Sequence, residues 1–123
     1  MSSILIIDDD YLTLNYLSKV LDRLGYEVIT ALNGNEGIER YSAKPVDVVI
    51  TDIIMPKKEG VETIAEIKKK HPESKIIAIS GGGRGCSSGY LQIAKMMGAD
   101  FTLEKPFSKD ELIQLISRLT STC

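Results

Sequence analysis

The chain has 123 residues, of which 15 are basic and 17 acidic, so its formal net charge is −2. This length suits one domain, and we expect residues 1–123 to form it. The charge lacks the basic excess of nucleic-acid-binding proteins, and no apolar run approaches the length that crosses a bilayer. Because the first residues also lack the basic segment of a signal peptide, we expect a cytoplasmic protein that binds neither nucleic acid nor membranes.

The predicted elements alternate between strands and helices along the chain. Nearly continuous apolar runs rich in β-branched residues indicate strands covered on both faces, whereas apolar residues three and four apart indicate helices. In chain order, strands are predicted at 4–7, 27–31, 46–50, 76–79 and 101–103, and helices containing 17–24, 36–43, 61–65, 90–97 and 112–119. This alternation predicts an α/β fold, a doubly wound five-stranded parallel sheet with helices on both faces.

Two helix boundaries carry local signals. Gly25 can end the first helix in a left-handed conformation. Ser108 and Glu111 have the spacing of a capping box at the start of the last helix. We also expect His71 to be a solvated residue at a helix end, far from any pocket at the carboxyl edge of the sheet.

Three consecutive acidic residues, Asp8, Asp9 and Asp10, directly follow the first predicted strand. One of them can cap the next helix, because a carboxylate accepts hydrogen bonds from the first backbone N–H groups of a helix. A cap needs only one carboxylate, and closely packed like charges repel each other unless a cation offsets them. The cluster therefore predicts a site for a divalent metal ion.

Asp52 and Lys105 follow two other predicted strands. Asp52 stands in the most apolar part of the sequence, and Lys105 precedes Pro106. The carboxyl ends of parallel strands meet at one edge of a sheet, so we expect both groups beside the acidic cluster. A carboxylate can attack phosphorus and form an acyl phosphate where a metal ion and a cation neutralise the phosphoryl oxygens.

Ser80 ends the fourth predicted strand and precedes the glycine-rich run at 81–85. The segment is either a plain loop with serine as a turn residue or a loop whose serine hydroxyl binds a phosphoryl oxygen. The glycines match neither Gly-x-Gly-x-x-Gly nor Gly-Lys-Ser/Thr, so neither a dinucleotide site nor a P-loop is predicted.

Together these residues resemble the receiver domain of two-component response regulators over the whole chain. The resemblance rests on Ile6-Ile7-Asp8-Asp9-Asp10, Thr51-Asp52-Ile53-Ile54-Met55-Pro56 with Gly60, Ser80, Gly98-Ala99-Asp100 and Lys105-Pro106-Phe107. Each motif is short, but their order and spacing together are specific. The resemblance implies the flavodoxin-like receiver fold, with strand order 2-1-3-4-5 and five flanking helices.

The resemblance also implies a metal site and a phosphoacceptor. Asp52 would take a phosphoryl group from a sensor histidine kinase or a histidine phosphotransfer protein. Mg²⁺ would be held by Asp8, Asp9, Asp52 and the backbone carbonyl of Ile54, whereas Asp10 would be a helix N-cap. Such a domain catalyses only its own phosphorylation and dephosphorylation, so no enzyme acting on external substrates is expected.

Ser80 and Lys105 match the remaining two catalytic positions, a hydroxyl that follows the phosphoryl group and a lysine that pairs with it. The resemblance implies that phosphorylation shifts the fourth and fifth helices and changes a surface that binds a downstream protein. The chain departs from the family at Thr102, where an aromatic residue often couples to the hydroxyl movement. The signal would then depend on the glycine-rich run or on Tyr90.

Several alternatives stay open at this point. A metal-dependent phosphatase with an Asp-x-Asp motif would need a second carboxylate at position 54, where Ile54 stands. A flavin-binding module can share the architecture, and a degenerate receiver would serve only as a scaffold. A receiver could act as a single-domain regulator, which the chain resembles most, or belong to a hybrid kinase or longer regulator.

Overall fold

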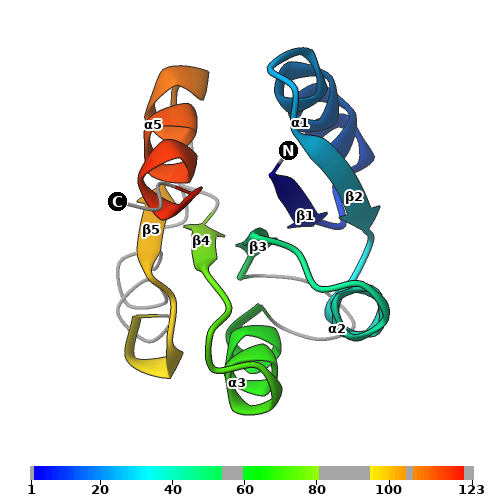
Figure 1. The fold of residues 1–123 in the computed structure, drawn as a ribbon, viewed down its shortest axis with the longest axis vertical. Coiled ribbons are helices and arrows are strands. Elements are labelled where there is room, and N and C mark those ends of the chain that lie inside the picture. The colour runs from blue at the N-terminus through cyan, green and yellow to red at the C-terminus, as the bar shows by residue number, and fades with distance from the viewer. Residues whose placement is uncertain (1, 54–59, 81–94, 105–106, 121–123) are drawn as a thin grey trace.

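Five parallel strands form the central sheet of the computed structural model, which describes residues 2–53, 60–80, 95–104 and 107–120, without the side chains of residues 60, 61 and 80. The strand order is β2-β1-β3-β4-β5 (Figure 1). The strands are β1 (Ser3–Ile7), β2 (Glu27–Ala31), β3 (Val48–Asp52), β4 (Ile76–Ser80) and β5 (Phe101–Glu104). The predicted parallel sheet and the strand order implied by the resemblance are confirmed.

Helices connect the strands, as predicted. They are α1 (Tyr11–Arg23), α2 (Gly34–Ala43), α3 (Gly60–Lys70) and α5 (Lys109–Thr120). Of the predicted fourth helix, residues 95–97 are helical, and the preceding residues 90–94 lie outside the described residues. Within the described ranges, no helix is long and apolar enough to cross a membrane.

Alternate residues of the central strands supply two apolar layers, one on each face of the sheet. Leu5 of β1 belongs to a buried cluster shared with α2 and α3. Its neighbour Ile6 belongs to the cluster shared with α1 and α5. Figure 1 shows the same division, with α1 and α5 on one side of the sheet and α2 and α3 on the other. Successive side chains of a strand point to opposite faces, so a strand buried on both faces needs a continuous apolar run.

The edge strands β2 and β5 have less apolar sequences than the three central strands. In β2, Glu27 is exposed and the following three residues are half-buried, whereas β3 is buried throughout. An edge strand has a neighbour on one side only, so its residues need less apolar character. The boundary predicted for β3 was wrong by two residues. Val46 is buried but precedes the strand, while Thr51 and Asp52 continue its pairing with β4.

The two predicted boundary signals are confirmed. Gly25 has φ +94° and directly follows Leu24, the C-cap of α1. At the start of α5, the Ser108 hydroxyl oxygen accepts a hydrogen bond from the backbone N–H of Glu111 at 3.1 Å. The Glu111 carboxylate accepts the backbone N–H of Ser108 at 3.2 Å in return. These reciprocal bonds satisfy backbone donors that a helix leaves unpaired at its start.

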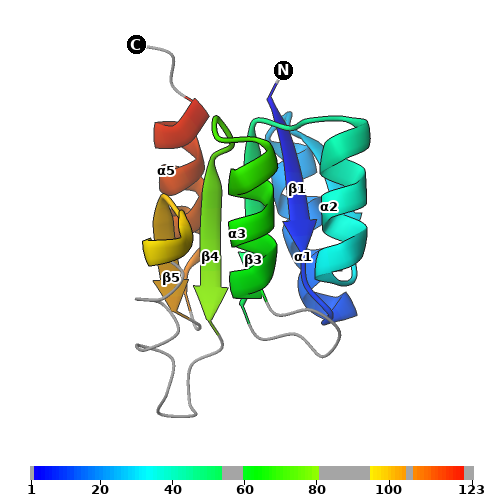
Figure 2. The same cartoon turned by 90° about the horizontal axis from the view of Figure 1, so that it is seen from below.

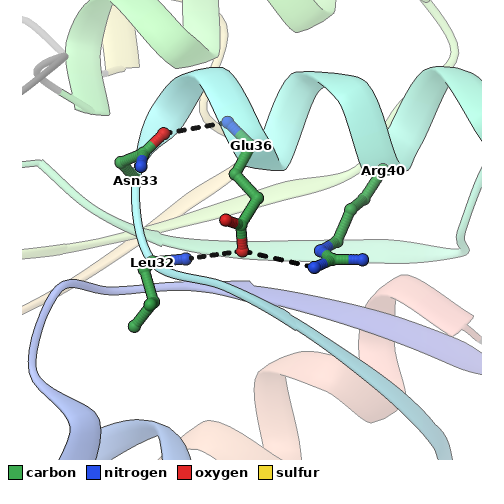
Figure 3. Close-up of polar contacts among 4 residues, drawn as sticks. All are labelled: Leu32, Asn33, Glu36 and Arg40. Carbon is green, nitrogen blue, oxygen red and sulfur yellow. Dashed lines mark hydrogen bonds and ion pairs between the residues drawn. The ribbon is translucent and has the colours of Figure 1, made fainter.

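A second capping arrangement begins α2 two residues before the predicted start of that helix. Asn33 Oδ1 accepts the backbone N–H of Glu36 at 2.9 Å (Figure 3). Glu36 Oε1 accepts the backbone N–H of Leu32 at 3.2 Å and a guanidinium N–H of Arg40 at 3.4 Å. The Asn33 side chain thus fixes the first turn of α2, and Glu36 ties that turn back to the end of β2.

Replacing Asn33 with alanine removes the acceptor for one backbone N–H, so we expect Asn33→Ala to lower the free energy of unfolding by about 1 kcal/mol. Urea unfolding monitored by circular dichroism measures this change. Asn33→Asp keeps a side-chain acceptor and is the matched control, with an expected change below about 0.5 kcal/mol. Equal unfolding midpoints for wild type and Asn33→Ala would contradict the capping role.

Candidate functional site

The acidic residues that follow β1 and end β3 are brought together by the register of these two adjacent strands. Ile7 of β1 pairs with Thr51 of β3, so Asp8 and Asp52 take the next position on each strand. Parallel strands end at the same edge, and the arrows of β1, β4 and β5 point the same way in Figure 2. The predicted convergence of Asp8 and Asp52 at the carboxyl edge of the sheet is therefore present.

Asp8, Asp9 and Asp52 form a compact group of carboxylates. One oxygen from each side chain lies within 4.8 Å of the others. Asp8 is 2% exposed and Asp52 is 8% exposed, whereas Asp9 is exposed to solvent. Mg²⁺ takes oxygen ligands, commonly one or two carboxylates completed by water or by a phosphate group. These three carboxylates supply oxygen ligands of the kind that Mg²⁺ prefers, so the residues fit a divalent cation such as Mg²⁺.

Asp10, the third acidic residue of the cluster, has a different task. Its side chain accepts the backbone N–H of Leu12 at 3.1 Å and the hydroxyl of Thr13 at 2.8 Å, so it is the N-cap of α1, as expected. Its backbone N–H donates to Asp8 Oδ1 at 2.9 Å. The backbone at the start of α1 therefore also helps to orient the Asp8 carboxylate beside those of Asp9 and Asp52.

The other predicted site residues are described only in part. The backbone of Ser80 ends β4 beside Glu104 of β5, at the same edge as Asp52. The Ser80 side chain, Ile54 and Lys105 lie outside the described residues, as do the glycine-rich run at 81–85 and Tyr90. Thr102, at the position of the departure from the family, is half-buried on β5 and pairs with Ala78.

Sequence reasoning gave no role to Thr51, the residue before Asp52. Its side chain is fully buried, and its hydroxyl donates to the backbone carbonyl oxygen of Asp52 at 3.0 Å. The available signal was one hydroxyl at the end of the otherwise apolar run Val48-Val49-Ile50. A buried hydroxyl needs a hydrogen-bond partner, but the sequence does not reveal which group accepts.

A separate group of ionisable residues lies at the amino ends of the strands, at the opposite end of the sheet from Asp52. His71 follows α3 there, and its ring centroid lies 4.6 Å from that of Tyr41. His71 lies at the end of α3, as predicted, but its side chain is only 24% exposed because it packs against Tyr41 of α2, so it is half-buried and not fully solvated. Burial, helped by the charges of Glu73 and Asp47, raises the pKa of the Tyr41 hydroxyl above its usual range. This group is remote from Asp52, which stands at the other end of the parallel strands.

Comparison with known proteins adds a family match to this geometry. The family model described as the response regulator receiver domain matches residues 4–117. The chain is 32% identical to a chemotaxis protein CheY of Thermotoga maritima over 95% of this chain and 96% of that protein. It is 31% identical to the transcriptional regulatory protein CpxR of Klebsiella pneumoniae over 94% of this chain, but this match covers only 48% of CpxR.

Solved structures give the same result. A response regulator receiver domain protein from Clostridium thermocellum has a TM-score of 0.88 and 33% identity, with 97% of this chain and 94% of that chain covered. The response regulator TrrA of Thermotoga maritima, solved in complex with Mg²⁺ and BeF, has a TM-score of 0.85 and 34% identity. There the match covers 97% of this chain and 99% of that chain.

Proposed function

Because the chain belongs to the response regulator receiver family, we propose that it accepts a phosphoryl group on Asp52 with the help of Mg²⁺ and thereby switches a protein-binding surface. One observation carries the proposal: one carboxylate oxygen of the buried Asp52 lies within 4.8 Å of a carboxylate oxygen of Asp8 and of one of Asp9. That group of oxygens suits a divalent cation beside a nucleophilic carboxylate.

The reaction proposed for Asp52 is the transfer of a phosphoryl group from a phosphohistidine. One carboxylate oxygen of Asp52 forms a bond to phosphorus while the bond from phosphorus to the imidazole nitrogen of the donor breaks. The electron pair of the broken bond stays on the imidazole. Hydrolysis of the resulting acyl phosphate later returns the carboxylate and releases inorganic phosphate. Asp52 acts as the nucleophile, and its placement at the end of a fully buried strand limits its movement before attack.

The acidic residues around Asp52 would hold the ion. Asp8 and Asp9, with Asp52 and the backbone carbonyl of Ile54, are the proposed ligands. When bound, Mg²⁺ supplies positive charge that neutralises the phosphoryl oxygens and the carboxylates in the transition state. Ser80 and Lys105 are proposed to bind phosphoryl oxygens through a hydroxyl and an ammonium group.

The proposed partners are proteins. A sensor histidine kinase or a histidine phosphotransfer protein would be the phosphoryl donor, and a downstream protein would read the switched surface. We propose that residues 1–123 form one receiver domain that works in the cytoplasm and has no external substrate. A receiver within a longer regulator, favoured by the partial coverage of CpxR, or within a hybrid kinase is the second candidate.

Intact mass after incubation with a small phosphoryl donor tests the proposal. With acetyl phosphate or phosphoramidate and Mg²⁺, we expect the wild-type protein to gain about 80 Da, the mass of one phosphoryl group replacing a proton. Chelation of Mg²⁺ by EDTA is expected to prevent the gain. Because an acyl phosphate hydrolyses at alkaline pH, brief exposure to base should restore the original mass. A folded protein that gains no mass from either donor would contradict the proposal.

A further inference from the structure

The Thr51 hydroxyl lies inside the apolar layer between the sheet and helices α2 and α3. Thr51 is fully buried, and both Val49 of β3 and Ile53, the residue after β3, belong to that layer. Its side chain points to the face opposite that of Asp52, because successive residues of a strand alternate. The hydroxyl donates to the carbonyl oxygen of Asp52 at 3.0 Å. A threonine side chain is stiff about its first torsion, so this bond is held in a narrow range of geometries.

The same peptide group is held at its other end by β4. The backbone N–H of Ile53 donates to the carbonyl oxygen of Ile79 at 3.0 Å. The carbonyl of Asp52 and the N–H of Ile53 belong to one planar peptide group, so the two bonds fix its orientation from both sides. The orientation of this group determines the torsion about the Cα–C bond of Asp52. It therefore helps to determine the direction in which the Asp52 side chain leaves the backbone.

We infer that Thr51 is a positioning residue that aligns the Asp52 carboxylate for attack on phosphorus, an inference that rests on the proposed function. In-line transfer requires the attacking oxygen, the phosphorus and the leaving nitrogen to be aligned, and a misplacement of about 1 Å can cost about 100-fold in rate. Strand β3 ends at Asp52, where the chain leaves the sheet. The Thr51 hydroxyl adds a hydrogen bond at the point where the pairing of the strand stops.

Thr51→Val tests the hydroxyl alone, because valine has nearly the same shape and no donor. We expect the initial rate of phosphorylation by acetyl phosphate at saturating Mg²⁺ to fall about tenfold in Thr51→Val. Thr51→Ser keeps the hydroxyl and is expected to stay within about twofold of wild type. Thr30→Val is the matched control, because it removes a half-buried hydroxyl from edge strand β2 and should leave the rate unchanged.

The outcomes separate this inference from the proposed function. Slow phosphorylation in Thr51→Val, with recovery in Thr51→Ser and unchanged urea midpoints, supports the positioning role. A wild-type rate in folded Thr51→Val overturns it while leaving the proposed function intact. Equal slowing in both Thr51 variants also overturns it, because Thr51→Ser keeps the hydroxyl, so altered packing at this buried position would then be responsible. If the wild type gains no phosphoryl group, both the proposed function and the inference fail.

Discussion

Asp52→Asn is expected to abolish the Mg²⁺-dependent mass gain, with the phosphorylation rate at least about 100-fold below wild type. An amide oxygen is a far weaker nucleophile than a carboxylate, and the substitution also removes one charge from the proposed metal ligands. The isosteric change leaves the packing around position 52 intact. Intact mass and the rate of acetyl phosphate consumption measure the loss. Mg²⁺ titration of the same variant by calorimetry should show weaker binding.

The same substitution is expected to stabilise the metal-free protein. Three carboxylates within 4.8 Å repel one another, so removing one charge should raise the free energy of unfolding in EDTA by about 1 kcal/mol. Asp47→Asn is the matched control, since it removes a charge just before β3, at the opposite end of that strand from Asp52. It should leave the mass gain unchanged. A phosphorylated Asp52→Asn variant would place the phosphoacceptor elsewhere.

The sequence predicted the fold well wherever burial on both faces left a simple pattern. The continuous apolar run at 4–7 predicted β1 to within one residue, because a central parallel strand has no solvent-facing side. The start of β3 was predicted two residues early, because the apolar character of Val46 reports burial and not strand pairing. Helix α2 was predicted to begin too late because Asn33 determines its start, and capping by a single polar side chain gives a weak sequence signal.

The predictable part of the site is the part that depends on topology. Once β1 and β3 are parallel neighbours, Asp8 and Asp52 must lie at one edge of the sheet. The contribution of Thr51 depends on a hydrogen bond to one carbonyl oxygen and on the direction of one peptide group. Neither property follows from residue type or spacing, and both become visible only when the register with β4 is known.

Tight packing behind the site gives the other large expected effect. Gly37 of α2 lies against Ile7, the residue before Asp8, so closely that a Cβ atom would come within 2.8 Å of Ile7 Cγ1 and still closer to Cδ1. Ile7 is fully buried on the central strand, and we expect Gly37→Ala to lower the free energy of unfolding by about 2 kcal/mol. Alanine would otherwise favour the helix by about 1 kcal/mol, so a loss of stability identifies the steric clash.

Ile7→Val supplies the decisive partner for a double-mutant cycle, because valine lacks the Cδ1 atom that lies nearest to the introduced methyl group. Ile7→Val alone should cost about 1 kcal/mol. In its background, Gly37→Ala should still cost about 1 kcal/mol, because valine keeps the Cγ1 atom that lies 2.8 Å from the introduced Cβ atom, so the expected coupling energy is about 1 kcal/mol. Ile6→Val is the matched control, since Ile6 faces the other layer and its truncation should leave the cost of Gly37→Ala unchanged.

Additive effects of Gly37→Ala and Ile7→Val on the free energy of unfolding in urea would contradict the predicted clash with Ile7. They would show that helix α2 moves to relieve the contact while the Ile7 side chain stays in place. A movement of helix α2 alone would leave the carboxylate group unchanged. Because Ile7 directly precedes Asp8, a displacement of Ile7 would instead also shift Asp8 and weaken the proposed Mg²⁺ binding.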